Sequence, residues 1–599
     1  MTAFAAIVQK RDRPPAVDGV AEAISCLGAA GSSISVFERC ALIVAPLHRD
    51  DPPAPALLPS GVAIAGTIAL EAHRHLAATL GAPHTASGAA LIGSAYDRWR
   101  NGCTDRLGGE YAFALWDPRE QALVCARDGL GIRLLYVADT PDAVIVTNVL
   151  AAALCHPAVR DDLDEVALVA FLAHGGAADE TRTCYNGVRV VPAGHTLTFH
   201  ARDAARTQLR RHWRFPLPDN VPRPNAGAIE EEYRAVLADA VRDRLDATAT
   251  SIFLSGGVDS TTIAAAAAQV APPGTLQAIT TRYPRYVDDL ELPFARAAAG
   301  HLALPLTVLD ADKHIPWVVN PADPPLAAPL DEPILADWRD ALACAARHST
   351  VALYGEDGDV LLRPPGWPAL RAGASVPAIA LAAARYAVSA KRKPYLGLRL
   401  RERLGVAQPA GLRLPAWLRV DAPFEHGGQP PVLGRAAEKL PRHPSRPETQ
   451  SLLTSTTMAR TFAATIAPET TRRRIELRFP ILDTRVIQLV VSVPAIPWCQ
   501  HKTLPRRAYR GRLPAPVLDR PKTPLRGFNA ALVAAWRRGT SGRVQPPGPA
   551  LTRWIDVDEW TRTLQSGSAD EVMAAWRVSV LDTWLAGRRR QTLGAPCIR

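Results

Sequence analysis

Residues 250–260 read TSIFLSGGVDS, and this stretch decides the fold of the chain. An apolar strand over 250–254 runs into a loop with two glycines, and an alanine-rich helix, TTIAAAAAQVA, follows directly. Another strand (275–283), a helix (290–302) and a third strand (304–310) continue the alternation. Strands and helices that alternate at this spacing predict a parallel α/β sheet.

The loop itself predicts a phosphate site. It reads Ser255-Gly256-Gly257-Val258-Asp259-Ser260. The glycines let the backbone approach an anion closely, and the amides lie at the start of a helix. Hydroxyl groups add donors, and the aspartate is suited to hold Mg²⁺ against phosphates. Because the GxxxxGK[ST] pattern is absent, the charge that offsets pyrophosphate must come from basic residues elsewhere in the chain.

The first third of the chain has a different pattern. Short runs of β-branched and aromatic residues, each bounded by turn residues, occupy 109–117, 122–128, 134–139 and 143–149. This spacing predicts antiparallel hairpins. Residues 215–225 then hold four prolines, and an amphipathic helix begins near Ala228. We therefore predict a first domain over 1–213, a linker over 214–227 and a second domain over 228–599.

Composition narrows the class of protein. Of 599 residues, 48% are hydrophobic and 21% are charged, which is typical of a folded, soluble protein. No apolar run reaches the roughly 18 residues of a membrane span, and the first residues lack a signal-peptide pattern. The nine cysteines are scattered and never form CxxC, so we expect reduced thiols in the cytoplasm, without disulfides or a zinc site.

Charge is unevenly placed along the chain. Residues 401–599 hold 32 Lys and Arg against 15 Asp and Glu, a difference of +17, while the whole chain carries +11. The first 400 residues therefore sum to −6. A basic half suits nucleic acid or a polyphosphate ligand. No RNA- or DNA-binding signature accompanies it, so we expect a polyphosphate and no nucleic-acid partner.

The pyrophosphate loop resembles that of the asparagine synthetase superfamily, SGG-[LIV]-DS. Five further blocks match this superfamily in order: Thr280-Thr281 with Glu291–Ala295, Tyr354–Asp359 (like SGEGxDE), Ile475–Asp483 (like E-x-R-x-P-F-L-D), Lys502–Arg506 (like K-x-x-L-R) and Arg520–Lys522 (like R-x-K). The resemblance implies an α/β parallel-sheet ATP pyrophosphatase domain of the adenine nucleotide alpha hydrolase type.

The first domain resembles the glutaminase domain of glutamine-dependent amidotransferases at 106–117, 127–132 and 183–195, which implies an α+β sandwich of the N-terminal-nucleophile type with αββα layers. Two departures matter. Position 2 is Thr2 in place of the nucleophilic cysteine, and Ala65-Gly66-Thr67 stands where the oxyanion segment N-G-E is expected. Glutamine hydrolysis loses its nucleophile and a charge-stabilising donor. We expect a degenerate domain, with Thr2 as a replacement nucleophile the less favoured alternative.

The resemblance also implies cofactors and roles. ATP and Mg²⁺ are the expected cofactors, with Asp259 and Asp359 as the metal ligands. Adenosine contacts fall on Leu254, Thr281, Tyr354 and Gly355. Phosphate contacts fall on Ser255, Gly256, Gly257, Val258, Asp259, Ser260 and Arg506. Lys502 and Lys522 are expected to stabilise pyrophosphate and the developing oxyanion. Glu356 is the candidate general base, and a purely structural or metal-shell carboxylate is an equal alternative.

Among relatives with inactive first domains, the chain most resembles lasso-peptide macrolactam synthetases. The segments Pro415–Leu418 and His443-Pro444 and the length near 600 carry this resemblance. It implies a precursor peptide as substrate, a leader-peptide protease and leader-binding protein as partners, and a role in antibiotic biosynthesis. Three alternatives remain open: a β-lactam synthetase-like ligase, an ammonia-dependent asparagine synthetase-like ligase, and a non-catalytic protein that binds nucleotide or peptide.

Overall fold

The structure is a computed structural model of the 599-residue chain. It describes all residues except 1, 30, 49–50, 52, 177–180, 204–205, 220, 287–290, 315–325, 364–383, 385–413, 420–440, 442, 455–462, 521–526, 540–545 and 592–599. Most of the residues between Pro409 and Pro447 therefore lie outside the described residues. Within the described part, no helix is both long and apolar enough to cross a membrane.

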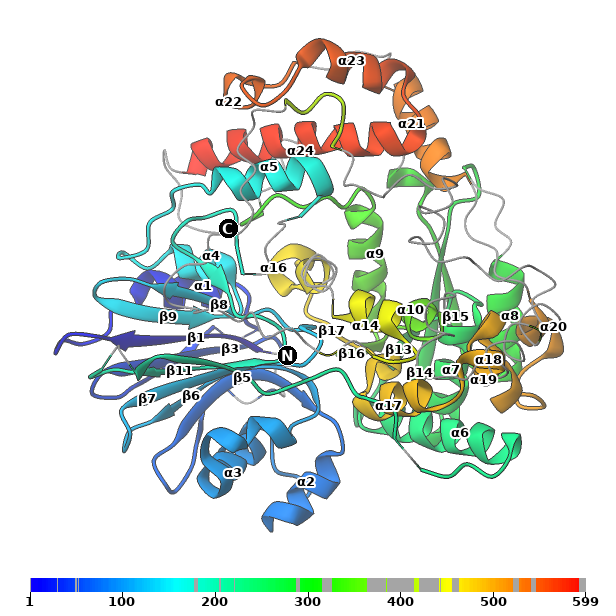
Figure 1. Ribbon diagram of the computed structural model, residues 1–599, viewed down its shortest axis with the longest axis horizontal. Helices are drawn as coiled ribbons and strands as arrows, with labels where there is room; N and C mark the ends of the chain where they lie inside the picture. Colours follow the sequence, from blue (N-terminus) through cyan, green and yellow to red (C-terminus); the bar gives the residue numbers. More distant parts are fainter. Residues whose placement is uncertain are drawn as a thin grey trace.

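The first domain contains two six-stranded antiparallel sheets (Figure 1). The first sheet has the order β10-β8-β9-β1-β3-β2 and the second the order β12-β11-β7-β6-β5-β4. The strands are β1 (Thr2–Gln9), β2 (Ser33–Val36), β3 (Cys40–Pro46), β4 (Ala56–Leu57), β5 (Ala63–Leu70), β6 (Gly109–Asp117), β7 (Ala122–Arg127), β8 (Tyr136–Asp139), β9 (Ala143–Thr147), β10 (Arg189–Val190), β11 (His195–His200) and β12 (Gln208–Arg211). The four strands predicted between 109 and 149 are all present.

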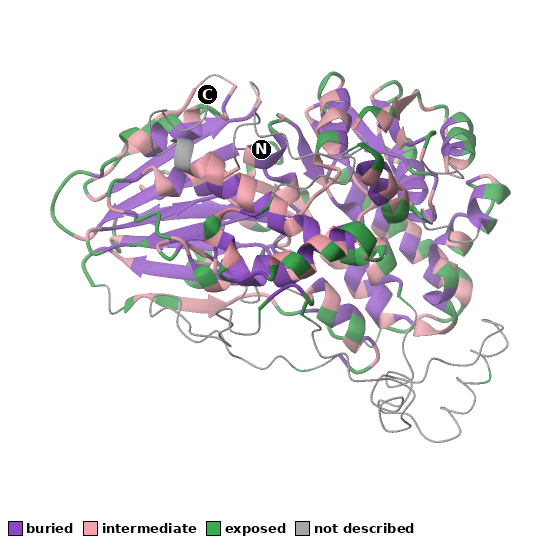
Figure 2. Ribbon diagram, turned by 90° about the horizontal axis from the view of Figure 1, so that it is seen from above, coloured by how far each residue is buried: buried purple, intermediate pink, exposed green. Residues whose placement is uncertain are grey.

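Three apolar cores separate four layers, which gives the αββα order that was predicted. One core lies between the sheets, where alternate residues of β1 such as Phe4 and Ala6 meet Ala114 and Trp116 of β6. A second core packs α2 (His73–Leu80) and α3 (Gly88–Trp99) on the outer face of the second sheet. The third packs α1 (Asp18–Ser25), α4 (Leu150–Leu154) and α5 (Glu165–His174) on the first sheet. Figure 2 shows the central strands of the sandwich buried, whereas the edge strands β2, β4 and β12 are partly exposed.

The second domain is built on a five-stranded parallel sheet with the order β15-β14-β13-β16-β17. Its strands are β13 (Thr250–Phe253), β14 (Leu276–Arg282), β15 (Leu306–Asp310), β16 (Val351–Leu353) and β17 (Glu476–Arg478). The chain starts in the middle at β13, fills one side through β15 and then crosses to the other side. In open parallel sheets, ligands bind at the carboxyl ends of the strands beside such a reversal.

Helices pack around this sheet and extend beyond it (Figure 1). They are α6 (Ala226–Arg242), α7 (Val258–Val270), α8 (Leu292–His301), α9 (Leu335–Ala346), α10 (Gly358–Leu361), α14 (Pro447–Leu453), α16 (Pro468–Thr471), α17 (Thr484–Ser492), α18 (Ala495–Trp498), α19 (Thr503–Ala508), α20 (Ala515–Asp519), α21 (Phe528–Gly539), α22 (Pro549–Thr552), α23 (Val557–Ser566) and α24 (Ala569–Gln591). α6 begins two residues before the predicted Ala228.

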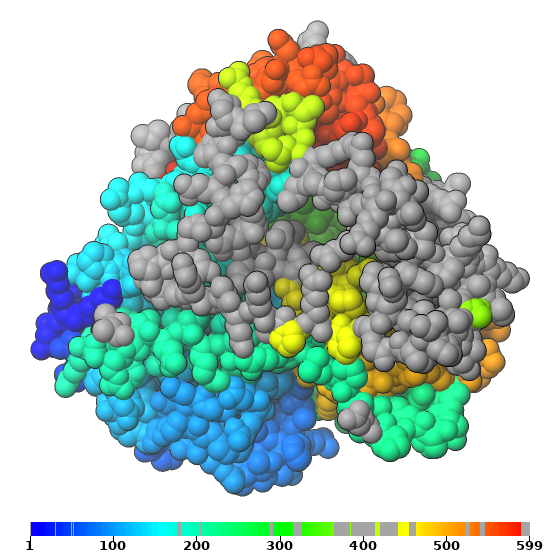
Figure 3. Space-filling view, in the orientation of Figure 1, coloured from blue at the N-terminus to red at the C-terminus, as the bar shows by residue number. Residues whose placement is uncertain are grey.

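The last helices share a core with the first domain. Trp554, Trp560 and Trp576 belong to the same buried cluster as Leu168 and Leu172 of α5. The segment around Trp417, yellow-green in Figure 3, lies on these helices, and its neighbour Leu418 bridges to Ile555. The last helices of the chain are therefore packed against α5 of the first domain.

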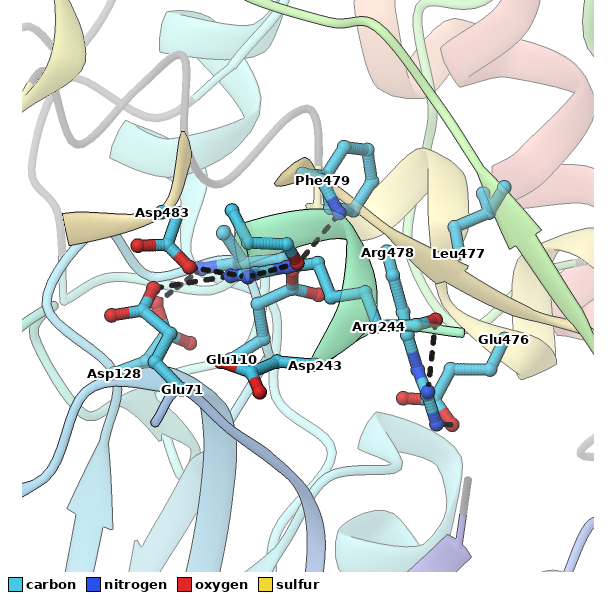
Figure 4. A network of polar contacts seen from close by, with 12 residues as sticks. Glu71, Glu110, Asp128, Asp243, Arg244, Glu476, Leu477, Arg478, Phe479 and Asp483 are labelled. Atoms are coloured by element: carbon cyan, nitrogen blue, oxygen red, sulfur yellow. Dashed lines mark hydrogen bonds and ion pairs between the residues drawn. The ribbon is translucent and has the colours of Figure 1, made fainter. Parts of the chain in front are cut away.

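A buried network of charges joins the two domains (Figure 4). Arg244, which is 3% exposed, donates to Glu71 (3.1 Å) and Glu110 (3.0 Å) of the first domain. The same guanidinium donates to Asp483 (2.6 Å) of the second domain. Arg133 crosses in the other direction and donates to Glu476 (3.1 Å) at the start of β17. Each domain thus supplies charges that neutralise the other.

Arg244→Ala should lower the free energy of unfolding by roughly 3–5 kcal/mol, because it leaves three carboxylates buried without their shared cation. Arg242→Ala is the matched control. Arg242 lies two residues away, and its ion pair with Asp239 is about half exposed. Removal of such a pair should cost less than about 1 kcal/mol. Urea unfolding of both variants measures the difference, and equal losses would contradict the importance of the network.

Candidate active site

The candidate site lies where the parallel sheet reverses its strand order. β13 and β16 are hydrogen-bonded neighbours, with Ser251 paired to Ala352. The segment 255–260 follows β13 and runs into the first turn of α7, and the segment 354–359 follows β16 and runs into α10. Because parallel neighbours end at the same edge, these two of the sequence blocks that resemble the superfamily meet there. We call them the pyrophosphate loop and the second loop.

Hydroxyl groups hold the pyrophosphate loop in shape. Ser260 Oγ accepts the backbone N–H of Ser255 (3.2 Å), and the two hydroxyls lie 3.1 Å apart. Gly257 N–H donates to Ser255 Oγ (3.3 Å). Gly256 has φ +74°, and an added Cβ would lie 2.6 Å from the amide nitrogen of Ala295 in α8. This backbone requires glycine both for its dihedral angle and for the close contact.

The second loop touches the pyrophosphate loop through two glycines. An added Cβ on Gly355 would lie 3.2 Å from the Cα of Ser260. A Cβ on Gly358 would lie 2.4 Å from the carboxyl carbon of Asp259. The two loops therefore leave no room for a side chain between them. This contact sets the position of the Asp259 carboxylate relative to Asp359 at the start of α10.

Lys502 lies between these two carboxylates. Its ammonium donates to Asp259 and lies 2.7 Å from Asp359 Oδ1. Burial would lower the pKa of Lys502, but the charges of Asp259 and Asp359 outweigh burial and raise the pKa above its ordinary value. Lys502 and the preceding His501 both have positive φ, 55° and 49°. Strained backbone of this kind is concentrated at functional sites.

The carboxylate pair fits Mg²⁺. Asp259 and Asp359 both contact the Lys502 ammonium, so the two carboxylates are close enough to share a cation. Mg²⁺ in nucleotide enzymes is typically held by one or two carboxylates together with substrate phosphates. Asp259 is 8% exposed whereas Asp359 is open to solvent. This difference leaves one side of the pair open for phosphate oxygens. The described residues contain no group of three or more His, Cys, Asp and Glu side chains placed to hold a metal ion.

Glu356 occupies the second loop in an unusual electrostatic setting. Burial and the charge of Asp357 raise the pKa of Glu356 to about 7, although the hydrogen bond from Tyr354 acts in the opposite direction. The carboxyl therefore exchanges its proton near neutral pH, which suits a general base. Asp357 itself has φ +60°, a conformation that few residues other than glycine adopt.

Aromatic side chains pack beside Tyr354, and the sequence did not predict the one from α9, Trp338. Trp338 of α9 packs on Tyr354 (5.2 Å between ring centroids) and on Phe253 of β13 (5.1 Å). Asp337 accepts from the hydroxyl of Tyr283 (2.7 Å), just past β14. A helix that follows a strand of such a sheet begins at the strand's carboxyl end. The run DEPILADW over 331–338 contained the signal, since its polar residues had to lie at this edge.

The other predicted residues are placed as follows. Leu254 is buried, and its N–H donates to Ile279 of β14 (2.8 Å). Thr281 is half-buried near the end of β14. Arg506 donates to backbone carbonyls, those of His501 (2.6 Å) and Arg520 (2.7 Å) among them. Lys522 lies outside the described residues. All these ligand roles remain predictions.

In the first domain, the positions expected to carry the nucleophile and the oxyanion donor of a glutaminase lie in strands β1 and β5. Thr2 opens β1 and is 8% exposed, and its carbonyl accepts a hydrogen bond from Asn148 (2.9 Å). Ala65 and Gly66 lie within β5, paired to β6. A Cβ on Gly66 would lie 2.7 Å from the side chain of Phe113. Neither a thiol nor a side-chain amide is present at these positions.

A separate cleft of about 540 Å³ lies between α5, α22 and α24, far from the two loops. Its rim charges are paired with one another, as Arg553 is with Glu165 at 2.7 Å. We assign no ligand to this cleft, because the chemistry-bearing residues gather at the parallel sheet instead.

Comparison with known families agrees with the geometry. The family described as asparagine synthase matches residues 232–586, more than half of the chain. The chain belongs to the asparagine synthase family. A glutamine amidotransferase domain matches residues 69–213, which leaves Thr2 and Ala65–Thr67 outside the match. Membership supports an ATP-dependent ligase that forms carbon–nitrogen bonds and uses ATP as its nucleotide.

Individual relatives are similar but distant. A putative glutamine-hydrolysing asparagine synthetase of Mycobacterium tuberculosis is 28% identical over 556 residues, 82% of this chain and 78% of that protein. Asparagine synthetase 3 of Bacillus subtilis is 28% identical over 174 residues, 29% of this chain and 28% of that protein. A solved glutamine phosphoribosylpyrophosphate amidotransferase of B. subtilis covers 51% of this chain and 65% of its own, at 13% identity and a TM-score of 0.26, too low to support an argument.

Gly358→Ala should weaken the binding of ATP with Mg²⁺ by at least about tenfold, because a Cβ 2.4 Å from the carboxyl carbon of Asp259 must displace that carboxylate. Gly300→Ala in α8 is the matched control, since no heavy atom lies within 4 Å of its added Cβ. Titration of the binding heat measures both variants. Unchanged affinity in Gly358→Ala would show that Asp259 is not a ligand of the metal–nucleotide complex.

Proposed function

We propose that this protein is an ATP-dependent lasso-peptide cyclase. It activates an Asp or Glu side-chain carboxylate of a precursor peptide and joins it to the peptide's N-terminal amine. The observation that carries this proposal is a contrast between the two domains. The candidate nucleotide site has its carboxylate pair, Lys502 and Glu356 together, whereas the glutaminase position holds Thr2.

The contrast bears on the source of nitrogen. A family member that takes ammonia from glutamine needs a nucleophile in its first domain. A substrate that brings its own amine makes that step unnecessary. In a peptide, the amine and the carboxylate belong to one molecule, so ring closure is intramolecular and benefits from proximity.

The first step is adenylation. An oxygen of the substrate carboxylate attacks the α-phosphorus of ATP, the bond from that phosphorus to the bridging oxygen breaks, and pyrophosphate leaves. The pyrophosphate loop binds the departing group through its amides and hydroxyls. Asp259 and Asp359 would hold Mg²⁺, which supplies positive charge to the phosphates. Lys502, fixed between the same carboxylates, adds a cation on this side.

The second step forms the amide. The amine nitrogen attacks the acyl carbon of the adenylate, the carbon–oxygen bond to the phosphate breaks, and AMP leaves. One proton of the amine must be removed, and Glu356 is the acceptor that the site offers. Its hydrogen bond with Tyr354 orients the carboxylate, and its raised pKa makes it a stronger base than an exposed glutamate.

The first measurement is mass spectrometry of the purified protein with ATP, Mg²⁺ and a linear core peptide encoded beside its gene. The leader-removing protease is supplied so that a free amine exists. We expect the peptide to lose one water while AMP accumulates, and Asp259→Ala to abolish both. The matched control is Asp239→Ala, an exposed carboxylate on α6, which should leave both intact.

Other outcomes would assign other functions. AMP formation only with a small β-amino acid would identify a β-lactam synthetase-like ligase. AMP formation only with aspartate and ammonia would identify an ammonia-dependent asparagine synthetase-like ligase. Nucleotide binding without AMP formation under any of these conditions would contradict the cyclase and leave a non-catalytic relative.

The pH dependence of kcat tests Glu356 as the base. With its pKa near 7, Glu356 is protonated and inactive at low pH, so kcat should rise with pH through about 7. Glu356→Gln should lower kcat by about 10²–10⁴-fold and remove this limb. A limb near 8 should remain, because an N-terminal amine must itself be deprotonated. Retention of the limb near 7 in Glu356→Gln would assign it to another group.

A further inference from the structure

Arg520 lies against the pyrophosphate loop and is 7% exposed. Its guanidinium donates to the backbone carbonyl of Gly256 (3.2 Å) and to Glu291 Oε1 (3.0 Å). It also lies over the ring of Phe294, 4.7 Å from the centroid. Glu291 and Phe294 lie at the start of α8, which also touches Gly256. Arg520 therefore joins the loop to this helix.

Arg506 holds the backbone of Arg520 in turn. Its guanidinium donates to the carbonyl of Arg520 (2.7 Å) and to that of Leu518. Its Nε donates to the carbonyl of His501 (2.6 Å), next to Lys502. One side chain thus connects the turn that carries Lys502 with the segment that carries Arg520.

We propose that Arg506 and Arg520 are positioning residues rather than phosphate ligands, and we call them the arginine bracket. The bracket fixes the pyrophosphate loop relative to Lys502 through backbone carbonyls. This inference rests on the proposed nucleotide chemistry and deepens it, because it assigns two of the basic residues near the site to alignment.

The geometry of one peptide explains how the bracket acts. The Gly256 carbonyl and the Gly257 N–H belong to the same planar trans peptide and point in opposite directions. Arg520 holds the carbonyl, while the N–H points away and meets Ser255 Oγ (3.3 Å). Two glycines in succession leave this peptide free to rotate in the absence of a restraint. The guanidinium supplies the restraint.

A guanidinium is required for this task. It is planar and presents several N–H groups in a fixed arrangement, so Arg520 reaches a carbonyl and a carboxylate at once. Lysine keeps the charge but offers a single compact ammonium on a flexible stem. The bracket needs two directed contacts, one to the Gly256 carbonyl and one to the Glu291 carboxylate.

The test compares Arg520→Lys, Glu291→Gln and their combination in the full chain. Calorimetric titrations with ATP, with inorganic pyrophosphate and with AMP, each with Mg²⁺, give the affinities. Arg510→Lys and Glu231→Gln are the matched controls, since both residues are exposed. AMP lacks the β- and γ-phosphates, so its affinity reports whether each variant is folded with an intact adenosine site.

We expect Arg520→Lys and Glu291→Gln each to weaken ATP and pyrophosphate about tenfold while AMP binding stays unchanged. The double variant should lose no more than Arg520→Lys alone, because Arg520→Lys already disturbs the contact with Glu291. Arg506→Lys should act in the same direction. The two control variants should bind all three ligands as the unsubstituted protein does.

A direct phosphate contact predicts the opposite result for Glu291→Gln. This variant would then strengthen ATP binding, because it removes a negative charge. That result would overturn the bracket while the proposed ligase activity stands. If the unsubstituted protein binds AMP but neither ATP nor pyrophosphate, the bracket and the proposed function both fail.

Discussion

The buried charges around Arg244 are the constraint on which the remaining structure depends. Charges of this kind are costly to bury, and they are tolerated only when each finds its partner. Here the partners come from both domains, so neither domain is electrostatically complete alone. Glu476 and Asp483, which flank the last strand of the parallel sheet, take their positions from this network. The sheet edge beside the candidate site is thereby fixed by residues of the first domain.

This dependence gives the first domain a structural role. Thr2 and Ala65–Thr67 stand at the positions that were compared with a glutaminase, whereas Glu71 and Glu110 bind Arg244. Burial and the charge of Asp483 raise the pKa of Glu71, and Arg244 opposes that effect. The first domain thus supports the second through buried ion pairs with Arg244.

Local patterns made much of the fold predictable. The alternation from 250 to 310 gave every strand and helix in order, because each segment carries its own periodicity and turn residues. The alternation did not place Asp259 beside Asp359; only the resemblance to the asparagine synthetase superfamily implied that these two carboxylates lie together. Sequence spacing cannot show that Lys502 lies between these carboxylates, because the contact depends on how helices after the sheet return to it.

Contacts between distant, individually ordinary residues were not predictable. The ion pair from Arg133 to Glu476 spans 343 positions, and each residue taken alone resembles a solvated surface charge. Arg506 matches a basic motif, yet its guanidinium donates to backbone carbonyls, because the motif records charge and not direction. Trp338 lies in a run with no glycine or nucleotide signature. In each case the fold, and not the local sequence, decides what the side chain meets.

The core that α5 shares with the last helices of the chain has a consequence for protein synthesis. The apolar face of α5 is covered by α24, and about 400 residues of chain separate them. At a translation rate of about 5–20 residues per second, the first domain waits on the order of 20–80 s before its covering helix leaves the ribosome. During this interval the face formed by Leu168 and Leu172 is open to water and to other nascent chains. The first domain therefore keeps this apolar face uncovered until α24 has been synthesised.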